Sequence, residues 1–250
     1  MTRGAGSGVI GASTGGVLLG VGASVVFGSG EVRKRSVSIG CVTVLAGILT
    51  RHGNGVGAAL DVETMDTVVP AGSGRRHVLH ILHRMLHRPP ATQSSATNLH
   101  DFLRAAFPVI SRRSLVFVVS DFFSTAPWTE ALAQLAQRHE VIAVRLYDPL
   151  EHELPDLGLL TMQDAETGEQ VFVDTHDRGF RRRFMQVTEE REARLRAGFR
   201  DAGVDALELS TYDDLADAIM RFADLRKRRS RLAAGAVMLR AEPHDGVPLA

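Results

Sequence analysis

The hydrophobic pattern centres on residues 115–119, where five consecutive residues are apolar. Two arginines precede this run, and Ser120 and Asp121 follow it. An apolar run of this length without polar alternation is typical of a strand buried on both faces, which occurs in parallel sheets covered by helices. Ligands of such sheets bind beyond the carboxyl ends of the strands, so we expect Asp121 at a functional edge.

Segments with helical periodicity alternate with further apolar runs along the chain. Apolar residues at steps of three and four predict helices over residues 31–52, 76–88, 97–110, 128–138 and 178–202, and a last helix from about residue 214. Short apolar runs predict strands over residues 56–60, 67–70, 141–146 and 207–209. This order indicates an α/β fold with a Rossmann-like, doubly wound, mostly parallel sheet.

Two hairpins are expected to interrupt this alternation. The runs at residues 56–60 and 67–70 are joined by a polar turn and predict a hairpin at the sheet edge. Residues 157–162 and 170–174 flank a turn with the sequence Glu-Thr-Gly-Glu. They predict a second hairpin, inserted into the domain and protruding from it.

Composition narrows the function classes. With 250 residues, 44% of them hydrophobic, the chain suits one α/β domain with appendages. The formal net charge is zero, so no overall charge points to nucleic acid, and we expect no nucleic-acid partner. The single cysteine, Cys41, allows no intrachain disulfide and favours a reducing compartment, hence the cytoplasm.

Both ends differ from the domain predicted over residues 17–229. Residues 1–16 are a glycine-rich leader, and membrane association through residues 9–27 is the alternative to a cytoplasmic location. Glycine costs about 1 kcal/mol in a helix interior, which disfavours a spanning helix here. The basic run at residues 226–231 is expected to end the last helix, where the helix dipole favours cations; contact with an anionic membrane or nucleic acid is the alternative. Residues 230–250 are expected to be a disordered tail.

Two sequence patterns resemble known binding motifs, but each lacks residues that the motif requires. His80, His83 and His87 share one helix face at zinc-binding spacing, but arginines lie beside them and a solvated basic face is the simpler interpretation. Gly20 and Gly22 begin a dinucleotide-binding fingerprint, whose third glycine is replaced by Val25. This partial fingerprint is the reason for an alternative interpretation, in which the chain is a nucleotide-binding Rossmann-type enzyme.

The chain resembles the bacterial von Willebrand factor A-like proteins of an uncharacterised family associated with MoxR-type AAA+ ATPases. The resemblance spans about residues 24–229 and is carried by four runs: VVPAGSGRRHVLHILHRML at 68–86, RRSLVFVVSDF at 112–122, RLYDPLEHELPDLGLL at 145–160 and DAETGEQVFVDT at 164–175. It implies a sheet of the von Willebrand factor A type, with a metal-ion-dependent adhesion site at its carboxyl edge. It also implies sequence upstream of the motif loop, and we expect either that the reading frame begins late or that the leader replaces this sequence.

The metal motif of the family is only partly matched. Its D-x-S-x-S loop falls on residues 20–24, so Ser24 matches, as do Thr97 and Asp121 in the second and third loops. Gly20 and Gly22 stand where a carboxylate and a hydroxyl are required. Because magnesium is usually anchored by one or two carboxylates, we expect a degenerate site in which Mg²⁺ is possible but weak or absent, and no other cofactor.

The resemblance implies a non-enzymatic protein-interaction module, an adaptor or chaperone-assembly partner of a MoxR-type AAA+ ATPase or of its client protein. Asp148 follows the strand predicted at residues 141–146 and should reach the same edge as Asp121. The expected interaction rim is therefore Ser24, Thr97, Asp121 and Asp148. The sequence shows no acid–base pair, no nucleophile with a base and no complete phosphate loop, so we expect no enzyme activity.

Overall fold

The computed structural model of the chain describes residues 15–20, 34–61, 65–87, 99–124, 127–163 and 170–240. The chain divides into two units, Met1–Asp213 and Asp214–Ala250, and each is described by itself.

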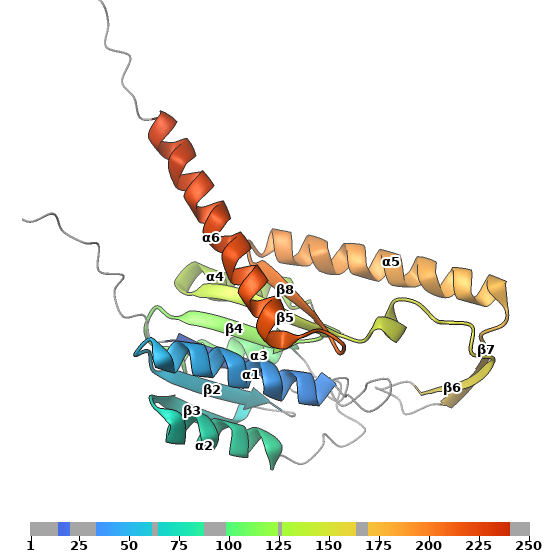
Figure 1. The fold of residues 1–250 in the computed structure, drawn as a ribbon, viewed down its shortest axis with the longest axis horizontal. Helices are drawn as coiled ribbons and strands as arrows, with labels where there is room; N and C mark the ends of the chain where they lie inside the picture. The colour runs from blue at the N-terminus through green and yellow to red at the C-terminus, as the bar shows by residue number, and fades with distance from the viewer. Residues whose placement is uncertain are drawn as a thin grey trace, which may run out of the picture. The chain divides into compact units, whose positions relative to one another are not determined.

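The described strands of the first unit form a six-stranded sheet and a separate two-stranded hairpin (Figure 1). The order of the larger sheet is β3-β2-β1-β4-β5-β8. Its strands are β1 (Gly15–Gly20), β2 (Val56–Asp61), β3 (Met65–Gly72), β4 (Leu115–Ser120), β5 (Glu140–Tyr147) and β8 (Asp205–Ser210). All neighbours are parallel except β2 and β3, which form the predicted antiparallel hairpin at the edge. The mostly parallel sheet is confirmed.

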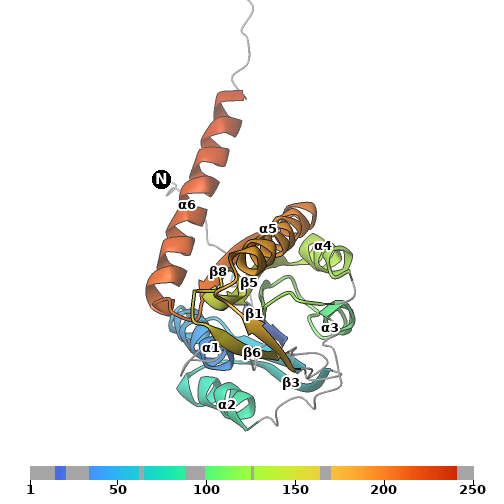
Figure 2. The same ribbon diagram turned by 90° about the vertical axis from the view of Figure 1, so that its right-hand side faces the viewer.

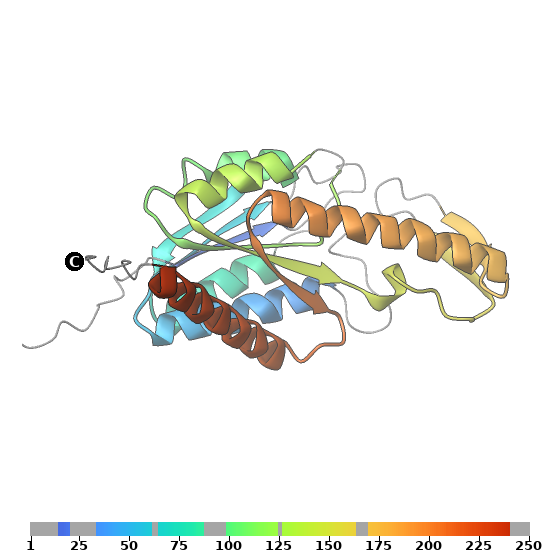
Figure 3. The same ribbon diagram turned by 90° about the horizontal axis from the view of Figure 1, so that it is seen from above.

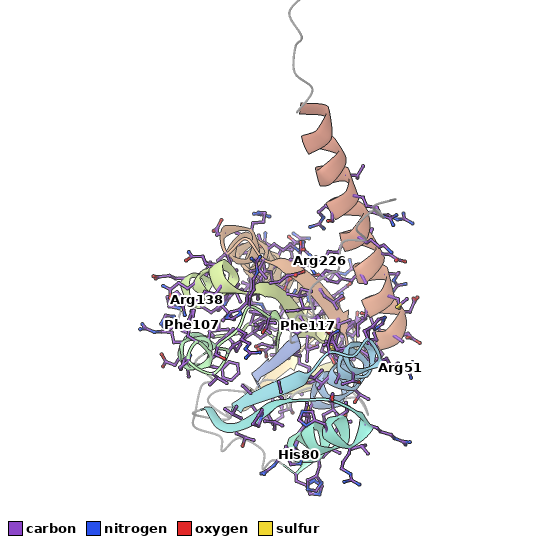
Figure 4. The ribbon with its side chains drawn as sticks, turned by 90° about the vertical axis from the view of Figure 1, so that its left-hand side faces the viewer. Arg51, His80, Phe107, Phe117, Arg138 and Arg226 are labelled. Atoms are coloured by element: carbon purple, nitrogen blue, oxygen red, sulfur yellow. The ribbon has the colours of Figure 1, made fainter. Side chains whose placement is uncertain are left out.

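Helices cover both faces of this sheet, as a doubly wound fold requires (Figures 2 and 3). One face carries α1 (Lys34–Arg51) and α2 (Arg75–Leu86), and the other carries α3 (Leu99–Ala106), α4 (Thr129–Arg138) and α5 (Arg178–Asp201). The apolar run predicted as a buried strand is β4, and its Val116, Val118 and Val119 are fully buried. In Figure 4 Phe117 lies within the fold, whereas His80 points outward from α2.

An aromatic cluster locks the loop after β4 against α4 and α5. The Phe122 ring packs edge-on against Trp128 and Phe199, with centroids 5.1 and 4.8 Å away. Gly198 allows this contact, because a Cβ there would stand 2.9 Å from the Trp128 ring. A larger residue at 198 would therefore push α5 away from the loop that carries Asp121.

The protruding hairpin is also confirmed. It consists of β6 (Leu159–Gln163) and β7 (Gln170–Asp174), which pair antiparallel with each other. A short 3₁₀ helix, η2 (Pro149–Glu151), leads from β5 toward it. Figure 1 shows the hairpin beyond the carboxyl ends of β4 and β5, at the start of α5.

The second unit contains α6 (Leu215–Arg240), and here the structure differs from the sequence-based expectation. The helix continues past the basic run at residues 226–231, so this run lies inside the helix and the dipole at a helix end does not explain it. Residues 230–240, expected to be disordered, are helical; they are rich in alanine and leucine, which favour helix.

Within the described part of the chain, no helix is both long enough and apolar enough to cross a membrane. Of the stretch 9–27, for which membrane association was the alternative, residues 15–20 are strand β1, and the others lie outside the described residues.

Candidate functional site

The carboxyl edge of the sheet brings two of the four predicted rim residues to the same side. Asp121 directly follows β4 and Asp148 directly follows β5, and these strands are parallel neighbours. Ser24 and Thr97 lie outside the described residues. The site is therefore built here from Asp121, Asp148 and the side chains around them.

A strained turn fixes the direction of Asp121. Phe122 has a φ of +59°, the left-handed region that bulky residues rarely adopt. Its backbone N–H donates to Ser120 Oγ at 3.0 Å, and the next N–H, of Phe123, donates to Asp121 Oδ1 at 3.1 Å. Because the Phe122 ring is held in the aromatic cluster, the turn stays in this conformation and leaves Oδ2 for another partner.

That partner is Lys34, the first residue of α1. Its Nζ lies 3.7 Å from Asp121 Oδ2 and forms a second ion pair with Glu151 Oε1. The ammonium also lies 5.2 Å from the centroid of the Phe123 ring. Lys34 is 0% exposed and Asp121 2%, and neither Nζ nor Oδ2 forms a hydrogen bond with the described residues.

These charges depend on one another. An unpaired buried charge costs several kcal/mol, whereas a paired one is compensated by its partner. Asp121 thus depends on Lys34, whereas the charge of Lys34 is compensated by Glu151 as well as by Asp121.

Glu151 joins this group to α5. Its Oε2 accepts the Asp148 backbone N–H at 3.3 Å, and its backbone oxygen accepts from Arg191 Nη2 at 3.2 Å. The Arg191 guanidinium lies 4.2 Å from the centroid of the Phe123 ring. Burial lowers the pKa of Arg191 from its ordinary value, and Glu151 opposes that effect.

Asp148 has a structural role in this arrangement. It is fully buried; its Oδ1 accepts from Leu150 N at 3.0 Å and its Oδ2 from Thr211 Oγ1 at 3.1 Å. Together with Glu151 it forms the capping box of η2. Both carboxylates are buried and hold loops in place, and the contact of Asp121 and Asp148 with a partner stays a prediction.

The residues present do not fit the divalent metal that the resemblance implies. Magnesium requires near-octahedral oxygen ligation. Gly20, at the end of β1, offers no side-chain oxygen, and Lys34 faces the remaining oxygens of Asp121 and Glu151. Nowhere in the described ranges do three or more His, Cys, Asp or Glu side chains form a group able to hold a metal ion, the histidines of α2 included.

A second buried ion pair lies on the next strand. Arg145, on β5, pairs through both terminal nitrogens with Glu192 of α5, and its Nη1 lies 3.8 Å from Glu208. His152 lies 3.7 Å from Glu192; burial lowers the pKa of this imidazole, and Glu192 opposes the shift. This pair attaches α5 to the sheet.

The hairpin is fastened at its base to the start of α5. Thr175, fully buried, donates through Oγ1 to Gly158 O at 2.7 Å and accepts from Leu157 N at 2.9 Å. Arg181 of α5 forms an ion pair with Asp156 at 2.9 Å and donates to Thr175 O. The hairpin, its connecting loop and α5 thus form one connected arm.

This arm exposes large apolar side chains. Leu159 is 72% exposed and Phe172 71%. Leu159 pairs with Asp174 and Phe172 with Thr161, so the two apolar side chains lie diagonally on one face of the hairpin, within reach of each other. We call Leu159 and Phe172 the hairpin face.

Sequence patterns did not indicate Lys34, Glu151 or Arg191. One signal was available for Lys34: a basic residue opens α1, whose first turn contains no acid, although a helix N-terminus disfavours cations. For Glu151, the sequence Asp-Pro-Leu-Glu after β5 carries a capping signature. Arg191 gave no local signal.

Two mycobacterial relatives match this chain. Uncharacterized protein Rv1480 of Mycobacterium tuberculosis is 31% identical over 206 residues, which cover 82% of this chain and 65% of the relative. Uncharacterized protein MAV169 of Mycobacterium avium is 34% identical over 163 residues, covering 65% of this chain and 95% of the relative. The chain thus spans just under two thirds of the length of the first relative.

Two solved structures share the fold. The conserved hypothetical protein BatB from Bacteroides thetaiotaomicron aligns with a TM-score of 0.54 and 12% identity over 85% of this chain and 99% of that one. An aerotolerance-related membrane protein from Bacteroides fragilis aligns with a TM-score of 0.54 and 10% identity, over 84% and 97%. At this identity the likeness shows the fold alone, which is the α/β fold of the von Willebrand factor A type.

The sequence model of one family, described as "Protein of unknown function DUF58", matches residues 14–194. This match covers most of the larger unit, from β1 into α5. The chain therefore belongs to the DUF58 family.

Proposed function

We propose that this chain is a non-enzymatic protein-interaction module that binds a MoxR-type AAA+ ATPase, or a client protein of that ATPase, through the hairpin face. The observation that carries the proposal is the exposure of Leu159 and Phe172 as diagonal neighbours on a hairpin beyond the carboxyl edge of the sheet. Aromatic residues such as phenylalanine are enriched at protein interfaces relative to the rest of the surface. The ATPase as partner comes from the family resemblance.

The anchoring of the arm supports this role. Thr175 and Arg181 hold the hairpin to the start of α5, and the Arg145–Glu192 pair holds α5 to the sheet. A surface that is fixed before binding loses less conformational entropy when a partner docks. The hairpin face therefore suits recognition better than a loose loop would.

Charges around the hairpin indicate the chemistry of the partner. The start of α5 places exposed Arg178, Arg182 and Arg183 close to β7 in the chain. A complementary surface would offer an apolar pocket for Leu159 and Phe172 with acidic residues at its rim. An ATP-dependent partner would place this module in the cytoplasm.

The buried carboxylates favour this function over the enzymatic alternative. A general base has to reach the proton that it removes, but Asp121 and Asp148 are enclosed and already paired. The glycine pattern behind the nucleotide-binding alternative lies mostly outside the described residues, and no observation favours that alternative. We therefore propose no second function.

A biosensor titration against the MoxR-type ATPase from the same genome tests the proposal. We expect the double variant Leu159→Ser/Phe172→Ser to bind about tenfold more weakly than the unmodified chain, or worse, which corresponds to about 1.4 kcal/mol or more. The matched control is Leu79→Ser/Leu86→Ser on α2, where both leucines are also exposed. Weaker binding of the control, with unchanged binding of the hairpin variant, would overturn the proposal.

A further inference from the structure

We propose that the Lys34 ammonium is the resident cation of the carboxyl edge and takes the place, beside Asp121, that a divalent metal has in the resembled family. The disagreement between the expected metal and the residues found here is thus explained by a cation that belongs to the chain itself. On this account the site excludes a metal for as long as Lys34 is present.

The division of the carboxylate oxygens supports this assignment. Asp121 Oδ1 accepts a hydrogen bond from the Phe123 backbone N–H, and Glu151 Oε2 accepts one from the Asp148 backbone N–H. The other oxygen of each, Asp121 Oδ2 and Glu151 Oε1, is directed at Lys34 Nζ. Two carboxylates converging with one free oxygen each on a single enclosed cation is the electrostatic arrangement of a metal site.

The presence of a lysine at position 34, and not an arginine, also supports this assignment. Of the 29 lysine and arginine residues in the chain, only two, Lys34 and Lys227, are lysines. An ammonium is a compact point charge, whereas the planar guanidinium is suited to two-point contacts such as that of Arg145 with Glu192. The position that requires a compact cation is thus filled by one of the two lysines, in a chain that otherwise uses arginine.

The position of Lys34 also needs an explanation that α1 does not provide. A cation at a helix N-terminus is disfavoured by the helix dipole, and a buried cation is disfavoured by desolvation. Asp121 and Glu151 offset both effects. A divalent ion at the same oxygens would meet the charge of Lys34, so the two cations exclude each other.

Manganese binding, followed by electron paramagnetic resonance and calorimetry, tests the inference on the full chain. We expect no saturable Mn²⁺ site at millimolar metal in the unmodified protein or in Lys227→Ser, the matched control at the other, exposed lysine. Lys34→Ser should acquire one site, at least about tenfold tighter than any binding by the control. The additional change Asp121→Asn should remove it.

Two results would overturn the inference: a saturable site in the unmodified chain that Asp121→Asn abolishes, or a folded Lys34→Ser protein that binds Mn²⁺ no better than the control.

A melting cycle keeps the inference testable if Lys34→Ser does not fold. The variants are Lys34→Met, Asp121→Asn and the two together, all measured without metal. Because Lys34→Met leaves Asp121 without its cation, we expect the double variant to melt at a higher temperature than Lys34→Met alone. A double variant that melts lower than both single variants, with the losses simply adding, would show that the two residues are not paired and would overturn the inference.

Discussion

Arg145 and Glu192 form a buried two-point ion pair, with Nη1–Oε2 and Nη2–Oε1 distances of 2.5 Å. The two residues are 47 positions apart, and η2, the hairpin and the first half of α5 lie between them. The pair therefore holds the segment between them, which includes the hairpin, to strand β5.

We expect Arg145→Met to lower the free energy of unfolding by about 3–5 kcal/mol, because it leaves Glu192 as an unpaired buried charge. Urea unfolding measures this loss. The double variant Arg145→Met/Glu192→Met should lose clearly less than the sum of the single losses. Arg221→Met breaks the exposed Arg221–Asp217 pair and should cost no more than about 1 kcal/mol. Equal decreases in the free energy of unfolding for Arg145→Met and Arg221→Met would show that the buried pair contributes no more to stability than the exposed pair.

Stability should fall as the solution becomes acidic, in part through His139 at the end of α4. Burial lowers the pKa of this imidazole below 6.5, and the neighbouring Arg138 adds to the effect. Above 6.5 the ring is neutral in both states; as the pH falls through 6.5 the unfolded chain takes up the proton first, so the free energy of unfolding decreases.

Melting temperatures between neutral pH and about pH 5.5 measure this dependence. His139→Gln should flatten it without removing it, because the pKa of His152 is lowered as well. His80→Gln, on the exposed face of α2, serves as the control and should keep the original slope. A slope that His139→Gln leaves unchanged would contradict the assignment.

Val118→Asp should abolish folding. Val118 is fully buried in β4, between Leu18 of β1 and Ala143 of β5. An unpaired buried charge costs several kcal/mol, against a total stability of about 5–15 kcal/mol. Val187→Asp makes the same change at an exposed valine of α5 and should melt cooperatively near the original temperature. Thermal unfolding of both variants, followed by circular dichroism, measures this difference. A cooperatively melting Val118→Asp protein would contradict the burial of β4.

Local patterns predict most of the sheet, because β2, β3, β4, β5 and β8 contain short apolar runs separated by periodic helices. They do not predict β1 (Gly15–Gly20), which lies between β2 and β4, because its three consecutive apolar residues are flanked by glycines. The run at residues 115–119 is short and is followed by polar residues, which favours a buried strand over a helix, and the runs at residues 157–162 and 170–174 predict the hairpin. The candidate site has no such local pattern. Lys34, Asp121 and Glu151 meet only in the folded chain, and no spacing in the sequence links them.

Asp148 follows β5 and lies at the carboxyl edge as predicted, and its role as the cap of η2 has a local signature in the sequence Asp-Pro-Leu-Glu. One difference between expectation and structure also has a local cause. The helix-dipole rule predicts that α6 ends at the basic run, but the helix continues to Arg240 because the alanine-rich segment after the run favours helix.

Hydrogen–deuterium exchange of this chain, with and without the MoxR-type ATPase, tests the proposed interface most directly. We expect the amides of β6, β7 and the first turns of α5 to exchange more slowly in the complex, while those of α2 and β3 exchange as in the free protein. Slower exchange confined to α2 and β3, with the hairpin unchanged, would contradict the account.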